Sequence, residues 1–152
     1  MPETKTRARK CLRLIKTELI PRVSEPGPAI KEPLVAGKEL AALIGSKDRE
    51  HFVVFHLDTR HRVQSFEIVA IGSLSAAIVH PREVFKGAIL ANASAIICGH
   101  NHPSGDPTPS EDDCEMHRRL EQVGELIGIE VLDQLIVAGT RCWSMRLQGE
   151  TW

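Results

Sequence analysis

The sequence contains no tyrosine, and its aromatic side chains are four phenylalanines and two tryptophans. These do not alternate with basic residues, as they do where aromatic rings stack on the bases of a single nucleic-acid strand. No apolar run reaches the roughly 20 residues of a membrane span, and charged residues rather than a signal-peptide pattern follow Met1. We therefore expect a cytoplasmic protein that neither spans a membrane nor stacks on single strands.

Two cysteine-based signatures are also missing. The four cysteines form no C-x-x-C pair, which excludes a zinc knuckle and a redox motif of the thioredoxin type. The sequence likewise lacks the H-x-E and P-C-x-x-C elements with which zinc-dependent nucleobase deaminases hold their metal. What remains is a chain of 152 residues whose 42% hydrophobic content is enough for a single core.

The net charge of −1 argues against a general polyanion binder, but the charge is unevenly placed. Residues 1–22 carry two acidic side chains and seven basic ones: Lys5, Arg7, Arg9, Lys10, Arg13, Lys16 and Arg22. We predict that residues 1–33 form a basic, proline-rich arm and linker, and that residues 34–152 form the globular domain. The arm is either a solvated terminus or a contact for nucleic acid or an acidic partner.

Hydrophobic periodicity and turn residues predict that helices and strands mix along the chain, which indicates an α/β fold. Within the arm, apolar residues at helical spacing favour a short amphipathic helix. In the domain, the predicted helices are residues 38–44, 82–92 and 110–127. The predicted strands are residues 52–57, 63–71, 95–98, 130–137 and 142–147, and residues 75–79 form a short apolar segment.

Potential metal ligands concentrate in the segment HNHPSGDPTPSEDD, from His100 to Asp113. In an extended backbone, side chains two residues apart point to the same side, so His100 and His102 can face one metal. Asp113 falls in the first turn of the following helix, to which the loop can fold back. Two histidines and a carboxylate leave a fourth zinc position open, as catalytic sites do, and the zinc lowers the pKa of water held there to about 7.

A hydrolytic site also needs a base for the water and a donor for the oxyanion. Ser110 is placed to be the donor, and Glu50, just before the first strand, is the candidate base. Glu67 and Glu83 are upstream carboxylates that spacing does not exclude. Ser110 and Asp113 also fit a helix capping box that needs no metal, but the two histidines before them favour a metal site.

The remaining polar residues of interest have simpler explanations. Turn chemistry in Gly-Asp-Pro is enough to explain Asp106. The other histidines lack ligand spacing, and we expect them at the surface or in the hairpin: His51, His56, His61, His80 and His117.

A glutamate followed by H-x-H, seven residues, serine, two residues and aspartate resembles the JAMM motif of JAB/MPN metalloprotease domains. The segment HNHPSGDP, preceded by HPREVFKGAI at residues 80–89, is similar to the RadC family in particular. The resemblance covers about residues 35–148, and the residues that match the motif are Glu50, His100, His102, Ser110 and Asp113.

The resemblance implies a cytidine-deaminase-like three-layer α/β/α sandwich with a mixed sheet. It also implies a zinc ion held by His100, His102 and Asp113, with Glu50 as general base and Ser110 stabilising the oxyanion. The reaction would be hydrolysis of an amide-type bond in a peptide or protein substrate, by a peptidase or isopeptidase.

Two alternatives accompany this reading. The historical name of RadC, a DNA-repair protein, implies a DNA-associated role, which the basic arm alone supports here. A metal-holding interaction module without catalysis is the other, and the complete set of motif residues argues against it.

The sequence departs from the family in two places. Family members usually carry a longer N-terminal part with a helix-hairpin-helix-like region, which has no counterpart in these residues. They commonly have Asp-His in the strand after the long helix, whereas Asp133 is followed here by Gln134. We expect Gln134 to alter a contact behind the ligands and to leave the ligands themselves intact.

Overall fold

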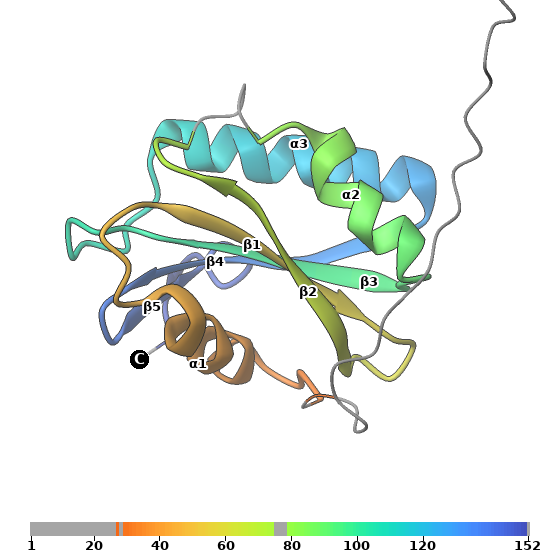
Figure 1. Ribbon diagram of the computed structural model, residues 1–152, viewed down its shortest axis with the longest axis horizontal. Helices are drawn as coiled ribbons and strands as arrows, with labels where there is room; N and C mark the ends of the chain where they lie inside the picture. The colour runs from red at the N-terminus through yellow and green to blue at the C-terminus, as the bar shows by residue number, and fades with distance from the viewer. Residues whose placement is uncertain (1–26, 28, 75–78, 152) are drawn as a thin grey trace, which may run out of the picture.

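The computed structural model describes residue 27, residues 29–74 and residues 79–151. Its helices are α1 (Pro33–Ile44), α2 (Pro81–Leu90) and α3 (Glu111–Ile127), and its strands are β1 (His51–Leu57), β2 (Val63–Ile71), β3 (Ala95–Asn101), β4 (Glu130–Ala138), β5 (Arg141–Ser144) and β6 (Gly149–Glu150). The six strands form one mixed sheet in the order β2-β1-β3-β4-β5-β6. Helices α2 and α3 cover one face of this sheet and α1 lies against the other (Figure 1), so the predicted α/β fold is confirmed.

Pairing in the middle of the sheet brings distant segments of the chain together. Strand β1 pairs antiparallel with both β2 and β3, and β3 pairs parallel with β4. All seven residues of β3 are buried, as expected for a central strand with helices on both faces. Phe52 is paired with His100, so the beginning of β1 lies beside the end of β3.

Alternation along the central strands divides the core into two layers. Phe52 and Cys98 pack toward α2 and α3, whereas Val53 and Ile97 pack toward α1. His100 follows Cys98 by two residues and therefore projects on the side of α2 and α3. The face on which a site residue lies is thus set by the register of β1 and β3.

Several element boundaries differ from the predicted ones. Helix α1 begins at Pro33 rather than residue 38, because proline suits the first helical position. Strand β3 continues to Asn101, past the predicted end at residue 98. Gly99 does not end this strand but allows α1 to approach it, since a Cβ there would lie 2.3 Å from Leu40 Cδ2.

The last predicted strand is also shorter than expected. Strand β5 ends at Ser144 rather than residue 147, and the short strand β6 that follows was missed. The buried carboxylate of Asp133 causes the early end, because it accepts hydrogen bonds from Ser144 Oγ at 2.6 Å and from the backbone N–H of Arg146 at 3.0 Å. These two bonds turn the chain away from the sheet.

The residues just before α1 contact the domain, although the prediction placed them in the linker. The backbone N–H of Gly27 donates to Val63 O at 2.9 Å, and that of Ile30 donates to His61 O at 2.8 Å. The side chain of Ile30 is buried. These contacts begin before residue 34, and the division of the chain at that residue stays a prediction. The predicted arm helix and residues 75–78 of the apolar segment lie outside the described residues.

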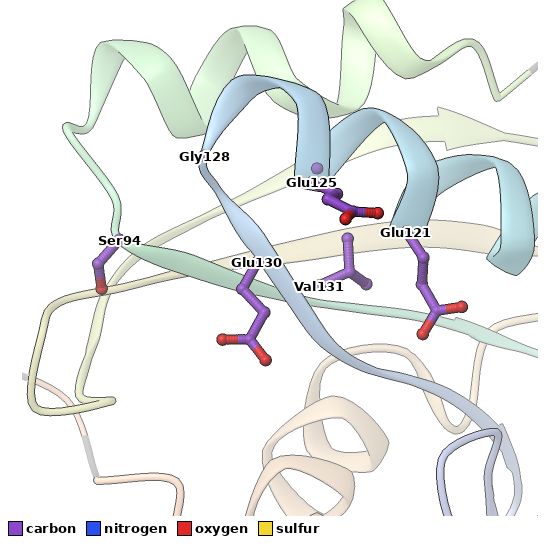
Figure 2. A pocket seen from close by; sticks show the side chains of 7 residues that line it. Ser94, Glu121, Glu125, Gly128, Glu130 and Val131 are labelled. Carbon is purple, nitrogen blue, oxygen red and sulfur yellow. The ribbon is translucent and has the colours of Figure 1, made fainter.

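A cavity of about 480 Å³ opens at the C-terminal end of α3. Figure 2 shows the exposed carboxylates of Glu121, Glu125 and Glu130 around Val131. None of the helices in the described part of the chain is long and apolar enough to cross a membrane.

Candidate metal centre

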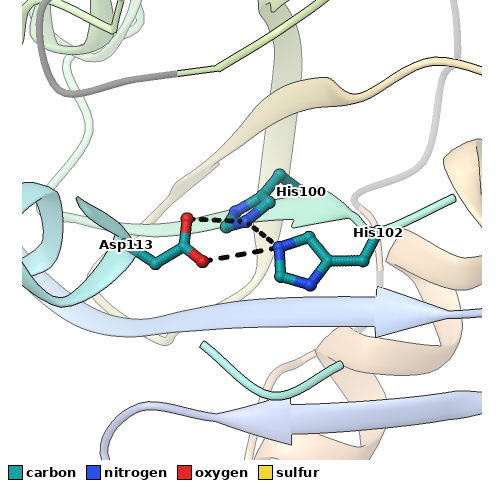
Figure 3. Close-up of side chains that lie close together, drawn as sticks. All are labelled: His100, His102 and Asp113. Carbon is teal, nitrogen blue, oxygen red and sulfur yellow. Dashed lines mark hydrogen bonds and ion pairs between the residues drawn. The ribbon is translucent and has the colours of Figure 1, made fainter. Parts of the chain in front are cut away.

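Three side chains that the sequence analysis named as ligands converge at the end of β3. His100 belongs to β3, His102 comes directly after the end of this strand, and Asp113 lies in the first turn of α3. His100 Nε2 lies 3.1 Å from Asp113 Oδ1, and His102 Nε2 lies 3.4 Å from Asp113 Oδ2. The two Nε2 atoms are 3.1 Å apart (Figure 3). These atoms are close enough to bind one metal ion.

The imidazole of His100 is held by the sheet. Its side chain is buried and stacks on Phe52 of β1, with ring centroids 6.1 Å apart and planes 17° from parallel. Nδ1 of this ring has no hydrogen-bond partner among the described residues. Packing against Phe52 therefore orients Nε2 toward the cluster.

The imidazole of His102 is held by a hydrogen bond instead. Its Nδ1 lies 2.8 Å from the backbone carbonyl oxygen of Asp106. A carbonyl only accepts, so Nδ1–H donates to it, and Nε2, once it has lost its own proton, can offer a lone pair to a metal. The Asp106 carboxylate accepts from the Thr108 N–H at 2.9 Å, as turn chemistry predicts. The role of the Asp106 carbonyl was missed, because every residue type carries one.

Asp113 is oriented by the capping box that the sequence analysis weighed against a metal site. The backbone N–H of Ser110 donates to Asp113 Oδ2 at 2.8 Å, and the backbone N–H of Asp113 donates to Ser110 Oγ at 3.1 Å. Burial on its own raises the pKa of Asp113, but hydrogen bonds with His100 and His102 outweigh it and hold the pKa below its usual value. The ionised carboxylate of Asp113 therefore takes part in both the helix cap and the ligand cluster.

Glu50 directly precedes β1 and lies two residues before Phe52, the partner of His100. The pairing of β1 with β3 ends at Phe52 and His100, so Glu50 lies just beyond the end of this ladder. The pKa of His102 is raised above its usual value. The hydrogen bond with Asp113 is the largest cause, and the charge of Glu50 also contributes. Glu50 Oε2 accepts the backbone N–H of Leu74 at 2.9 Å, which holds the half-buried side chain.

The two other carboxylates considered as bases lie at α2. Glu83 is exposed, and its Oε2 lies 2.8 Å from Lys86 Nζ. The carboxylate of Glu67 faces Gly87, where a Cβ would stand 2.2 Å from Glu67 Oε2. The geometry therefore favours Glu50 among the three candidates.

Gln134 lies behind the cluster, beside the strand that carries the histidines. It pairs with Cys98 on β3 and is fully buried. Its Oε1 and Nε2 have no hydrogen-bond partner among the described residues. The expectation that Gln134 alters a contact behind the ligands stays a prediction.

The remaining histidines take part in other contacts. His56 Nδ1 lies 2.8 Å from Ser65 Oγ within the β1–β2 hairpin, and burial lowers the pKa of His56 to about 4. His80 accepts the backbone N–H of Arg82 at the start of α2, and His117 lies 3.5 Å from Glu121 on α3. None of them belongs to the cluster described here.

Comparison with known proteins identifies the family. The RadC-like JAB domain matches residues 30–150 of this chain. The chain belongs to the RadC family of JAB-domain proteins. This membership agrees with the mixed sheet and the helices on both of its faces.

Similar proteins in the same family carry the name UPF0758, which states no activity. The chain is 52% identical over 101 residues to a UPF0758 protein of Geobacillus thermodenitrificans (strain NG80-2), covering 66% of this chain and 45% of that protein. It is 43% identical over 132 residues to one of Desulforudis audaxviator (strain MP104C), covering 84% and 56% respectively. This chain thus spans about half the length of these relatives.

Proposed function

We propose that this chain is a zinc-dependent hydrolase that cleaves an amide-type bond in a peptide or protein, as a peptidase or isopeptidase. The main observation in support of this proposal is the convergence of His100, His102 and Asp113. Zinc ligands at about 2.0–2.1 Å in a tetrahedral arrangement stand roughly 3.3–3.4 Å from one another. The two Nε2 atoms are 3.1 Å apart, and each lies 3.1–3.4 Å from one oxygen of Asp113, His100 from Oδ1 and His102 from Oδ2, so this spacing supports a zinc site.

Three protein ligands leave one tetrahedral position open. Zinc held by these three side chains would supply a water of lowered pKa at the open position and polarise the substrate carbonyl. Glu50, just before β1, would take the proton from the attacking water and later pass it to the leaving amine. The family's JAB domain is compatible with this chemistry.

Ser110 would stabilise the oxyanion while it caps α3. Its Oγ accepts the backbone N–H of Asp113, so the hydroxyl hydrogen remains to be donated. Ser110 is exposed, whereas Asp113 behind it is buried. This exposure supports a serine that meets a substrate approaching from solvent.

The deciding experiment is a screen for zinc-dependent hydrolysis of ubiquitin-like proteins and ordinary peptides, comparing the wild type with Glu50→Gln. Glu50→Gln should keep both fold and zinc, and turnover should fall roughly a hundredfold to ten-thousandfold through loss of general-base help. Glu125→Gln, which changes an exposed glutamate of α3, is the matched control and should leave turnover unchanged.

Two results would contradict this proposal. A zinc-loaded wild type inactive on all these substrates would favour the non-catalytic interaction module. Equal turnover in the wild type and Glu50→Gln would remove Glu50 from the reaction.

The DNA-associated alternative rests on the basic arm, which lies outside the described residues, and so it stays a prediction. Its test is salt-dependent DNA binding that is lost when residues 1–22 are deleted.

A further inference from the structure

We propose that Asn101, the residue between the two histidines, positions the base Glu50 relative to the metal ligands. This inference rests on the proposed function, because it concerns the geometry of that same site. Asn101 would act through Glu50 and would not touch the substrate itself.

The contacts of Asn101 all reach the segment that carries Glu50. Its Oδ1 accepts the backbone N–H of His51 at 2.7 Å. Its Nδ2 donates to the carbonyl oxygens of Arg49 at 2.9 Å and Lys47 at 3.3 Å. The side chain is 1% exposed, and both of its polar atoms are satisfied by these three bonds. Asn101 thus binds the residues on both sides of Glu50.

Asn101 takes over where backbone pairing stops. The register between β1 and β3 ends at the pair of Phe52 with His100. Beyond this pair, the amide side chain of Asn101 makes the contacts to the preceding chain that a continued ladder would make. The entry into β1 is therefore fixed against the same strand that carries the ligands.

The alternation of side chains makes this arrangement effective. His100 and His102 project toward α2 and α3, so Asn101 between them projects to the opposite face. One short stretch of β3 then holds the metal from one face and the backbone around Glu50 from the other. The distance from base to metal is set by a rigid strand rather than by loop conformation.

Other contacts hold Glu50 to the hairpin but not to β3. Its carbonyl accepts the N–H of Gly72 at 2.9 Å, and its carboxylate accepts the N–H of Leu74. Without Asn101, the position of Glu50 would depend on its contacts with the residues after β2 and no longer on β3, the strand that carries His100. A small displacement of a base from its target is enough to slow a reaction strongly.

The test compares the full-length, zinc-loaded wild type with Asn101→Ala, Glu50→Gln and the double variant. Ser144→Ala, which removes another buried hydrogen-bonding side chain, controls for general destabilisation. We expect Asn101→Ala to keep its zinc, to lower kcat roughly ten- to hundredfold, and to leave KM nearly unchanged. In the Glu50→Gln background the same substitution should cost nothing further, because the residue through which it acts is already disabled.

Amide hydrogen exchange provides a readout that is independent of activity. The N–H of His51 should exchange faster in Asn101→Ala than in Ser144→Ala, because only the former removes its acceptor. An unchanged kcat in Asn101→Ala, or an equal loss with and without the Glu50 carboxylate, would overturn the positioning role.

Failure of the proposed function would look different. If the wild type hydrolyses none of the substrates, crystal structures of the zinc-loaded wild type and Asn101→Ala decide the inference. A Glu50 carboxylate that keeps its distance from the zinc in the variant would overturn it, and a displaced carboxylate would support it. If Asn101→Ala does not fold, Asn101→Asp replaces it, since it keeps the acceptor for His51 and loses both donated bonds.

Discussion

The two ends of α3 both carry acidic side chains, but they differ in what surrounds those groups. At the N-terminal end, Asp113 is buried, receives hydrogen bonds from its own helix and meets two histidines. At the C-terminal end, exposed Glu121 and Glu125 line an open cavity of about 480 Å³. The place with the buried carboxylate is the one whose side chains are close enough to hold a metal ion.

The helix itself accounts for part of this difference. Free N–H groups and the positive end of the helix dipole favour carboxylates in the first turn, whereas the last turn disfavours them by about 0.3–1 kcal/mol. No basic residue balances the last turn of α3. Buried donors that converge on one point therefore indicate a ligand site, while cavity volume and acidic lining alone do not.

The largest expected difference between the two ends concerns the metal. Wild-type protein should hold about one zinc per chain, and His100→Ala/His102→Ala should hold almost none, because a single carboxylate remains. Glu121→Gln/Glu125→Gln should keep the full amount. Metal analysis after gel filtration checks this, and zinc that follows the glutamates instead of the histidines would reverse the comparison.

Ser110 tests whether capping and chemistry can be separated at the N-terminal end. Ser110→Ala removes both the cap acceptor and the donor, whereas Ser110→Asp keeps the acceptor and removes the hydroxyl. Turnover should fall roughly a hundredfold to a thousandfold in both variants. The free energy of unfolding should fall by about 0.5–2 kcal/mol in Ser110→Ala only. Wild-type turnover in Ser110→Asp would exclude the hydroxyl as donor.

Gly124 tests the packing of the C-terminal end. Replacement of a helical glycine by alanine in open space stabilises a helix by up to about 1 kcal/mol. At Gly124, however, a Cβ would lie 2.5 Å from the carbonyl oxygen of Ile129. Gly124→Ala should therefore lower the free energy of unfolding by about 1–3 kcal/mol, measured in urea, with zinc content unchanged. A stabilised variant would show that β4 yields easily here.

The smallest effect is a reciprocal pair of charge changes. Glu125→Lys should raise the free energy of unfolding by about 0.3–1 kcal/mol, and Glu111→Lys in the first turn should lower it by a similar amount. Both shifts should shrink as salt is added, because both residues are exposed. Shifts of the same sign in both variants would mean that overall charge, not helix polarity, is responsible.

Local patterns in the sequence predicted much of this architecture. The spans of β2 and the end of α3 follow from alternation and from Gly128, which takes the left-handed conformation at φ 73°. Boundaries failed where a distant contact decided them. Strand β3 runs through Gly99 because α1 packs there, and β5 stops at Ser144 because Asp133 binds it.

The sequence by itself determined the candidate ligand set and its convergence. Spacing of two in a strand puts His100 and His102 on one side, and the third position after a capping serine gives Asp113 a defined direction. Both rules are local, so they hold wherever the segment lies in the fold.

Only the tertiary structure decided which of the candidate glutamates lies next to the paired ends of β1 and β3, and what holds it there. Glu50, Glu67 and Glu83 are equivalent as upstream carboxylates, and the register of β1 against β3 distinguishes them. The bonds from Asn101 to the entry of β1 join residues about fifty positions apart, for which no local pattern exists. Strand register is set by the packing of whole layers, and so the position of the candidate base is a property of the folded sheet.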